Sequence, residues 1–177
     1  MTLKAFLVWE DAQDLKYEFD GVRPIGMAGG TNAHWRIQRN LAISIGGQLR
    51  GQPCEFLGSD VRIITDRTVR YPDGVVTCEP GANNGTSVTD PVVIFEVLSP
   101  STAGTDRITK NREYAAIPTV QRYVMLEQDR IGATVFSRAG DDWVGHVLAD
   151  DAMLALPEIG ITLPLAELYE GIDLSGD

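Results

Sequence analysis

Residues 92–100 read Val-Val-Ile-Phe-Glu-Val-Leu-Ser-Pro. This stretch is apolar almost throughout and rich in β-branched and aromatic residues, which predicts a strand buried on both faces of a mixed or parallel sheet. Glu96 lies in the middle of it. A buried carboxylate is costly unless a cation pairs with it, so we expect a cationic partner close to Glu96.

Two other segments can share in such a site. Residues 71–76 read Tyr-Pro-Asp-Gly-Val-Val and predict a short strand with Asp73 near its start. A proline in a strand pattern implies an edge, a bulge or a strand start, which would aim Asp73 away from the regular ladder. Downstream, residues 106–116 predict a polar helix that carries Lys110.

The order of the remaining elements indicates the fold class. The predicted helices span 3–10, 33–49, 106–116 and 165–169, and the predicted strands span 17–22, 54–65, 69–78, 92–98, 122–127, 133–137 and 143–148. This order predicts an α/β or α+β fold, a sheet with helices packed on it, in which 92–127 forms a βαβ unit. A length of 177 residues without an internal repeat predicts a single domain over 1–177.

The first predicted strand ends in the hairpin signal Asp20-Gly21. In the second predicted helix, apolar residues recur every four positions at Ile37, Leu41, Ile45 and Leu49, and in the third Tyr114 shares a face with Lys110.

Composition excludes some classes of protein. Hydrophobic residues make up 44% and charged residues 23% of the chain, as in ordinary soluble domains. No apolar run approaches the roughly 20 residues of a membrane span, and the N-terminus lacks the pattern of a signal peptide. We therefore expect a cytoplasmic protein without a membrane partner. In that reducing compartment Cys54 and Cys78 are expected to be free, buried thiols.

The net charge of −10 argues against a simple nucleic-acid binder, but the charge is unevenly distributed. Residues 139–177 hold nine acidic and no basic residues, so residues 1–138 are nearly balanced, with 16 acidic and 15 basic. The acidic end is either a solvated face that keeps the protein soluble or an interaction tail.

Asp73, Glu96 and Lys110 together could carry chemistry. Two carboxylates on neighbouring strands can hold one hard cation such as Mg²⁺, which activates a bound water and stabilises charge on a phosphoryl oxygen. A lysine beside that water can orient it or stabilise the developing charge. Taken singly, each residue also has an ordinary interpretation, as a turn aspartate, a glutamate in a salt bridge or a solvated lysine.

The chain also resembles a known family. The residues that carry the resemblance are Tyr17-Glu18-Phe19-Asp20-Gly21, His34, Pro72-Asp73-Gly74-Val75-Val76, Phe95-Glu96-Val97-Leu98-Ser99-Pro100-Ser101-Thr102, Asp106, Lys110, Tyr114 and Tyr123-Val124-Met125-Leu126. This pattern is similar to that of the Uma2 family, also called DUF820, within the PD-(D/E)XK, or restriction endonuclease-like, superfamily. The resemblance covers most of the chain.

The resemblance implies a restriction endonuclease-like core, with a mixed central sheet flanked by helices, and hydrolysis of DNA phosphodiesters with Mg²⁺ or Mn²⁺. It makes Asp73 and Glu96 the metal ligands and Glu18 an additional acidic residue. The superfamily lysine usually lies two positions after the second acid, where this chain has Leu98. A lysine that has moved to the following helix would correspond to Lys110.

Two functions remain open at this point. The first is a metal-dependent endonuclease with Asp73, Glu96, Glu18 and Lys110 as its site. The second is a catalytically inactive interaction or regulatory module, in which Glu96 pairs with Lys110 or Arg107 as a structural ion pair.

Candidate phosphate contacts for the enzyme are Arg36, Arg39, Arg107 and Arg112. His34 matches a recurrent family position, where capping or packing is favoured over catalysis. A homodimer is expected from the exposed edges of a mixed sheet and from the resemblance.

Overall fold

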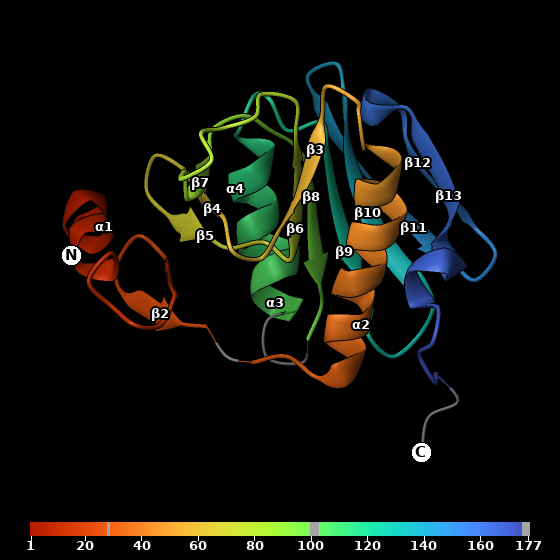
Figure 1. Ribbon diagram of the computed structural model, residues 1–177, viewed down its shortest axis with the longest axis horizontal. Coiled ribbons are helices and arrows are strands. Elements are labelled where there is room, and N and C mark those ends of the chain that lie inside the picture. Colours follow the sequence, from red (N-terminus) through yellow and green to blue (C-terminus); the bar gives the residue numbers. More distant parts are fainter. Residues whose placement is uncertain (28, 100–102, 175–177) are drawn as a thin grey trace.

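The computed structural model describes residues 1–27, 29–99 and 103–174. Its centre is a six-stranded sheet in the order β11-β10-β9-β8-β6-β3, with helices on both faces (Figure 1). These strands are β3 (Glu55–Gly58), β6 (Gly74–Thr77), β8 (Pro91–Val97), β9 (Arg122–Leu126), β10 (Gly132–Ala139) and β11 (Asp142–Ala149). Because β8 runs antiparallel to β6 and parallel to β9, the sheet is mixed.

Two smaller sheets accompany the central one in the described part of the chain. The first has the order β2-β1-β5-β4-β7, formed by β1 (Tyr17–Phe19), β2 (Pro24–Gly26), β4 (Arg62–Ile64), β5 (Val69–Arg70) and β7 (Ser87–Val88). The second pairs β12 (Met153–Leu156) with β13 (Ile161–Pro164), and the sequence predicted neither strand. A 3-10 turn, η3 (Pro157–Ile159), joins β12 to β13, and η4 (Leu165–Tyr169) follows.

The second helix confirms the predicted periodicity. α2 (Asn32–Leu41) continues into the π-helical turn η1 (Ala42–Gly46). Thr31 caps α2, since its hydroxyl accepts a hydrogen bond from the His34 amide at 3.1 Å. The buried face of this helix packs on one side of the central sheet, and its contacts include the β8 residues Val93, Phe95 and Val97. The helical residues of this face are Ile37, Leu41, Ile45 and, just beyond the helix, Leu49.

The other face of the sheet is covered by the connection between β8 and β9. It consists of α3 (Ala103–Thr105), the π-helical turn η2 (Asp106–Lys110) and α4 (Asn111–Ala115), which follow one another without a break. The predicted βαβ unit is therefore confirmed, although helical structure already begins at Ala103. Pro100, Ser101 and Thr102, the end of the motif quoted above, lie outside the described residues.

The break expected at Pro72 is confirmed and larger than expected. The predicted strand 69–78 is two strands, and β5 belongs to the five-stranded sheet while β6 belongs to the central one. The predicted strand 54–65 divides in the same way, into β3 and β4. Proline cannot donate to a ladder, so the chain changes sheets there and Asp73 immediately precedes β6.

The N-terminal region forms as its local signals predict. α1 (Leu3–Glu10) is capped by Thr2, whose hydroxyl accepts from the Ala5 amide at 3.2 Å. The hairpin of β1 and β2 turns at Asp20 and Gly21, where Gly21 has a φ of 90°. No helix in the described part of the chain is long and apolar enough to cross a membrane.

The expectation of free cysteines is wrong, because Cys54 and Cys78 form a disulfide. Glu55 pairs with Thr77 at the end of the β3–β6 ladder, so the next residue outward on each strand is a cysteine. Their Cα atoms lie 3.9 Å apart. The cysteine spacing did not reveal this bond, since it depends on which strands become neighbours.

Replacing both Cys54 and Cys78 with serine is expected to lower the free energy of unfolding by about 3 kcal/mol, because the bond closes a loop with a sequence separation of 24. Urea unfolding followed by circular dichroism measures this. A reducing agent should shift the wild-type midpoint and leave that of the double variant unchanged. Equal wild-type midpoints with and without the reducing agent would contradict the prediction.

Candidate active site

Lys110 lies at the centre of a buried cluster of carboxylates. Its Nζ is 2.9 Å from Glu96 Oε1, 3.1 Å from Glu18 Oε1 and 3.1 Å from Asp106 Oδ1. Asp106 and Lys110 begin and end the π-helical turn η2, and both are buried. Such turns occur frequently at functional sites, and here the turn brings the Asp106 carboxylate and the Lys110 ammonium together.

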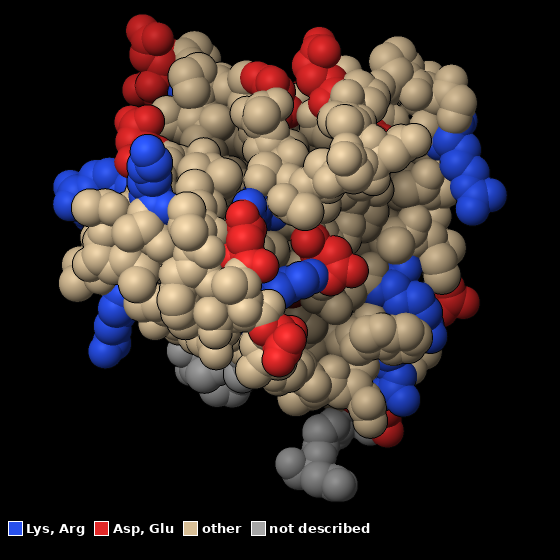
Figure 2. Space-filling view, turned by 60° about the vertical axis from the view of Figure 1, so that its left-hand side comes forward, with Lys and Arg blue, Asp and Glu red and all other residues tan. Residues whose placement is uncertain are grey.

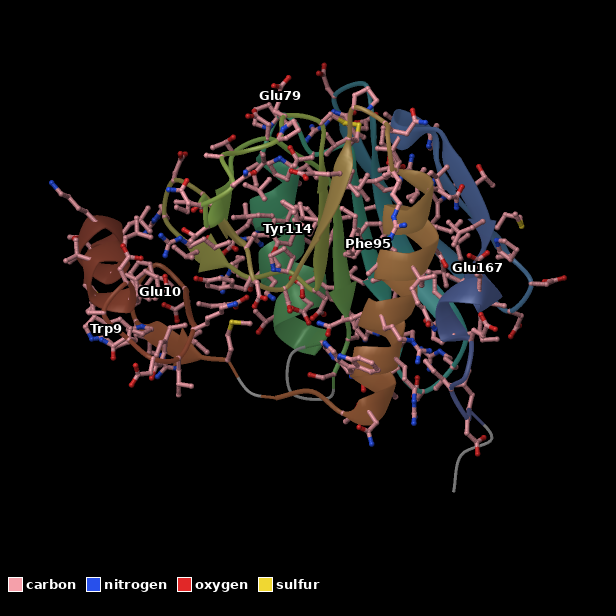
Figure 3. The ribbon with its side chains drawn as sticks, in the orientation of Figure 1. Trp9, Glu10, Glu79, Phe95, Tyr114 and Glu167 are labelled. Atoms are coloured by element: carbon pink, nitrogen blue, oxygen red, sulfur yellow. A yellow bond between two sulfur atoms is a disulfide. The ribbon has the colours of Figure 1, made fainter. Side chains whose placement is uncertain are left out.

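Glu96 faces Lys110 because side chains alternate along β8. Val93, Phe95 and Val97 pack toward α2, whereas Ile94 packs with α4 on the opposite face. Figure 3 shows this division, with Phe95 on the α2 side of the sheet and Tyr114 on the α4 side. The Tyr114 hydroxyl donates to Glu96 Oε1 at 3.1 Å, so Lys110 and Tyr114 share a helix face as predicted.

Glu18 reaches the cluster from β1 of the five-stranded sheet. Besides Lys110, it contacts Arg70, with 3.1 Å between Glu18 Oε2 and Arg70 Nη1, and it accepts a hydrogen bond from the Tyr71 amide at 3.2 Å. Arg70 also binds both carboxylate oxygens of Glu113, at 2.7 and 2.9 Å. Arg70 is 1% exposed, so this ion-pair network joins the five-stranded sheet to α4 through a buried guanidinium.

Asp73 stands at the end of the strand next to Glu96. Gly74 pairs with Phe95, which places Asp73 beside the position of Glu96 on the adjacent strand. Its carboxylate accepts three hydrogen bonds, from His34 Nε2 at 2.8 Å, Gln38 Nε2 at 2.5 Å and the Val97 amide at 2.6 Å. Asp73 is therefore tied to α2 and β8.

The contact with Asp73 gives the His34 ring a structural role that the sequence did not predict. His34 neither caps a helix with its ring nor packs in the apolar core, because its Nε2 binds the predicted metal ligand. Its Nδ1 is buried and has no hydrogen-bond partner among the described residues. Gln38, one turn later on α2, binds the same carboxylate oxygen, and nothing in the sequence pattern pointed to it.

The cluster has a strong electrostatic character. Burial raises the pKa of Glu96 well above its ordinary value; Lys110 opposes this, and the carboxylates of Asp73, Asp106 and Glu18 add to it. Burial alone would lower the pKa of Lys110, but the carboxylates of Glu96, Glu18 and Asp106 outweigh it and raise that pKa. Lys110 is thus held as an ammonium ion amid an excess of carboxylates.

The donor set fits a hard divalent cation. Asp73 and Glu96 supply carboxylate oxygens from adjacent strands, and the excess negative charge around Lys110 favours a further cation. Within the described ranges, no three His, Cys, Asp or Glu side chains are grouped as a complete ligand set. Mg²⁺ commonly binds through one or two carboxylates and keeps several waters, so two protein ligands agree with its coordination habits.

Some predicted contacts lie outside this cluster. Arg107 is half exposed and pairs with Glu127 at 2.7 Å, and Arg112 is exposed on α4. Arg36 and Arg39 lie on α2. Sequence reasoning did not assign Asp106 or Arg70 to the site. The spacing of four between Asp106 and Lys110 was a usable signal, whereas Arg70 and its carboxylate partners are 43 and 52 positions apart.

A mixed sheet flanked by helices, with carboxylates at the ends of adjacent strands and a lysine on the crossover helix, defines a restriction endonuclease-like α/β protein. The family model described as "Uma2: Putative restriction endonuclease" matches residues 3–166. The chain therefore belongs to the Uma2 family, as the sequence pattern indicated.

Two relatives and one solved structure agree with this assignment. The uncharacterized protein slr1290 of Synechocystis is 32% identical over 171 residues, covering 94% of this chain and 90% of the relative. The uncharacterized protein sll1609 of the same organism is 31% identical over 146 residues, covering 80% of this chain and 82% of that relative. The crystal structure of a putative nuclease belonging to DUF820 from Anabaena variabilis matches with a TM-score of 0.79 at 20% identity. The match covers 96% of this chain and 97% of that protein's chain. This likeness bears out the predicted fold class.

Proposed function

We propose that this protein is a metal-dependent endonuclease that hydrolyses phosphodiester bonds of DNA. The observation that carries the proposal is the buried contact between Glu96 and Lys110, with Glu18 on the same ammonium and Asp73 on the adjacent strand. A buried strand carboxylate beside a second acid and a lysine is the arrangement that metal-assisted hydrolysis requires. Membership in a family described as putative restriction endonucleases supports the same reaction.

Asp73 and Glu96 would hold Mg²⁺ or Mn²⁺, which lowers the pKa of a bound water and stabilises negative charge on a phosphoryl oxygen. Lys110 keeps its protons, so its Nζ acts as a hydrogen-bond donor that orients the attacking water or stabilises the developing charge. Glu18 and Asp106 position that ammonium, and Tyr114 fixes Oε1 of Glu96.

The exposures of three acidic residues of the site, Asp73, Glu18 and Glu96, indicate where a substrate would approach. The side chains of Asp73 and Glu18 are 13% and 14% exposed, whereas that of Glu96 is 5% exposed. A phosphodiester would therefore meet the cluster at Asp73 and Glu18, and Glu96 and Lys110 would lie behind them.

We expect Asp73→Asn to weaken Mg²⁺ and Mn²⁺ binding by more than about 100-fold, because it removes one of two carboxylate ligands. Isothermal titration calorimetry with each metal measures this, and supercoiled plasmid and labelled oligonucleotides test cleavage with Mg²⁺, Mn²⁺ or EDTA. Asp151→Asn makes the same chemical change at an exposed side chain between β11 and β12 and serves as the control. Wild-type protein that binds neither Mg²⁺ nor Mn²⁺ and cleaves neither the plasmid nor the oligonucleotides would overturn the proposal.

One observation favours the second function, a catalytically inactive interaction module. Glu96 and Lys110 already neutralise each other as a buried ion pair, which needs no metal to be stable. On this alternative the wild-type protein gives no metal-binding heat, and Glu96→Gln changes stability alone. The homodimer, the cytoplasmic location and the single domain expected from the sequence stay predictions.

A further inference from the structure

An open groove runs along α2 beside β3 and ends at the candidate active site. Its volume is about 450 Å³, and Trp35, Ile43, Phe56 and Asp73 are among its lining residues. A second hollow of about 530 Å³ shares Ile43 and Phe56 with it and extends to Arg50. The two hollows form one continuous path from Arg50 to the predicted metal ligand Asp73.

The groove presents an aromatic side chain that the fold does not use. Trp35 is 59% exposed and Ile43 is 64% exposed, although α2 buries its opposite face. Arg39 lies between them in sequence, and its guanidinium is 5.7 Å from the centre of the Trp35 ring. Asn40 Oδ1 accepts hydrogen bonds from Arg39 at 2.9 and 3.1 Å, which fixes the guanidinium against the indole. Trp35 is thus a positioned, solvent-facing aromatic surface.

The α2 side of the groove is basic, whereas Asp60, on its β3 side, is paired with Lys16. Residues 21–54 contain four arginines and neither Asp nor Glu, in a protein whose net charge is −10. Arg36 and Arg39 lie on α2 and Arg50 follows it. In Figure 2, basic side chains are spaced down the right-hand side of the molecule and also lie on its left, and acidic side chains lie near the centre and along the top. A basic segment beside an aromatic platform suits a polyanion with stackable bases.

We propose that this groove binds single-stranded DNA, with a base stacked on Trp35 and the backbone passing Arg50, and that it leads the strand to Asp73. This inference rests on the proposed nuclease function and names the strand form that reaches its site. Only an unpaired base can lay its face on an indole, because bases inside a duplex are covered by their neighbours.

A second copy of the chain is the other occupant that an exposed apolar face suggests. A two-fold interface through this surface would bring Arg39 and Arg50 of both copies into one interface, where burial of each guanidinium is costly unless it meets a carboxylate. The basic α2 side beside the exposed Trp35, with Asp60 already paired with Lys16, favours nucleic acid as the occupant.

Fluorescence anisotropy of a labelled oligonucleotide, titrated with the protein in EDTA, tests the proposal without any cleavage. We expect Trp35→Ala to weaken binding of single-stranded DNA by about 10-fold or more. Wild-type tryptophan fluorescence should be quenched on binding, and this quenching should fall in the variant. The matched control is Val147→Ala, an apolar truncation at an 80% exposed position on β11.

Arg50→Gln is expected to reduce the slope of log K against log salt by about 0.7, the loss of one phosphate contact on a single strand. Arg67→Gln makes the same charge change on the exposed β4–β5 turn and should leave the slope unaltered. Light scattering at the same concentrations should give the same mass for wild type and Trp35→Ala.

The outcomes separate this inference from the proposed function. Binding of single-stranded DNA in EDTA that depends on Trp35 supports the groove as the binding site, even where no cleavage is found. Duplex DNA bound as tightly as single strands, an affinity unaffected by Trp35→Ala, or single-stranded RNA bound at least 10-fold tighter would overturn it while metal-dependent cleavage stands. A fall in molecular mass caused by Trp35→Ala would overturn it in favour of an interface between copies.

Discussion

Changing Glu96 to glutamine is expected to reduce Mg²⁺-dependent DNA cleavage by more than about 100-fold while the protein stays folded. The amide has the shape of the carboxylate and can still accept a hydrogen bond from Lys110 and from Tyr114, which both contact Oε1. Burial and three neighbouring carboxylates already raise the pKa of Glu96, so loss of its charge also removes repulsion. Activity and stability should therefore respond differently to this change.

The measurement is initial cleavage rate at saturating Mg²⁺, together with a thermal melt of each protein. Glu167→Gln is the matched control, because Glu167 is exposed on η4, well away from Tyr114 and the cluster around it (Figure 3). A cleavage rate for Glu96→Gln within about twofold of the wild type would remove Glu96 from the catalytic site.

Replacing Lys110 with methionine is expected to lower the free energy of unfolding by about 3–5 kcal/mol, the cost of leaving a buried charge without its partner. Glu96, Glu18 and Asp106 all lose the same counter-ion, and Asp106 Oδ1 has no hydrogen bond within the described residues to replace it. Chemical unfolding monitored by circular dichroism measures this. Lys4→Met removes a lysine from the exposed surface of α1 and should change stability little.

A double-mutant cycle assigns the effect to the ion pair. Adding Glu96→Gln to Lys110→Met removes one of the uncompensated carboxylates, so we expect about 1–3 kcal/mol of the lost stability to return. Additive effects of the two changes, or equal stabilities for Lys110→Met and Lys4→Met, would show that Lys110 does not hold the cluster together.

The structure shows how this chain can place a lysine beside Glu96 from a helix. The position two residues after Glu96 is Leu98, which packs in the apolar cluster beneath α4. The π-helical turn η2 brings Lys110 back over the same strand, and Asp106 in the same turn holds it there. A shared ammonium thus joins β1, β8 and the crossover helix, although a fold of this kind does not by itself fix the reaction.

Local patterns of the sequence determined the framework of this protein. The apolar run around Glu96 predicted β8, the four-residue recurrence of Ile37, Leu41, Ile45 and Leu49 predicted α2, and Asp20-Gly21 predicted the first hairpin. Each depends on residues a few positions apart, whose side-chain periodicity or turn preference is a property of the local backbone. The family pattern also indicated Asp73, Glu96, Glu18 and Lys110, but it did not indicate that Asp106 would pair with Lys110 or Arg70 with Glu18.

Only the tertiary structure decided which groups meet. It placed three carboxylates on Lys110, bound Asp73 to His34 across 39 positions, joined the two cysteines and left Trp35 facing a groove. These contacts depend on the order and register of strands, which is set by how whole faces pack against one another. A short stretch of sequence determines the side-chain periodicity of its own helix or strand. Which element it packs against is determined by the packing of the complete chain.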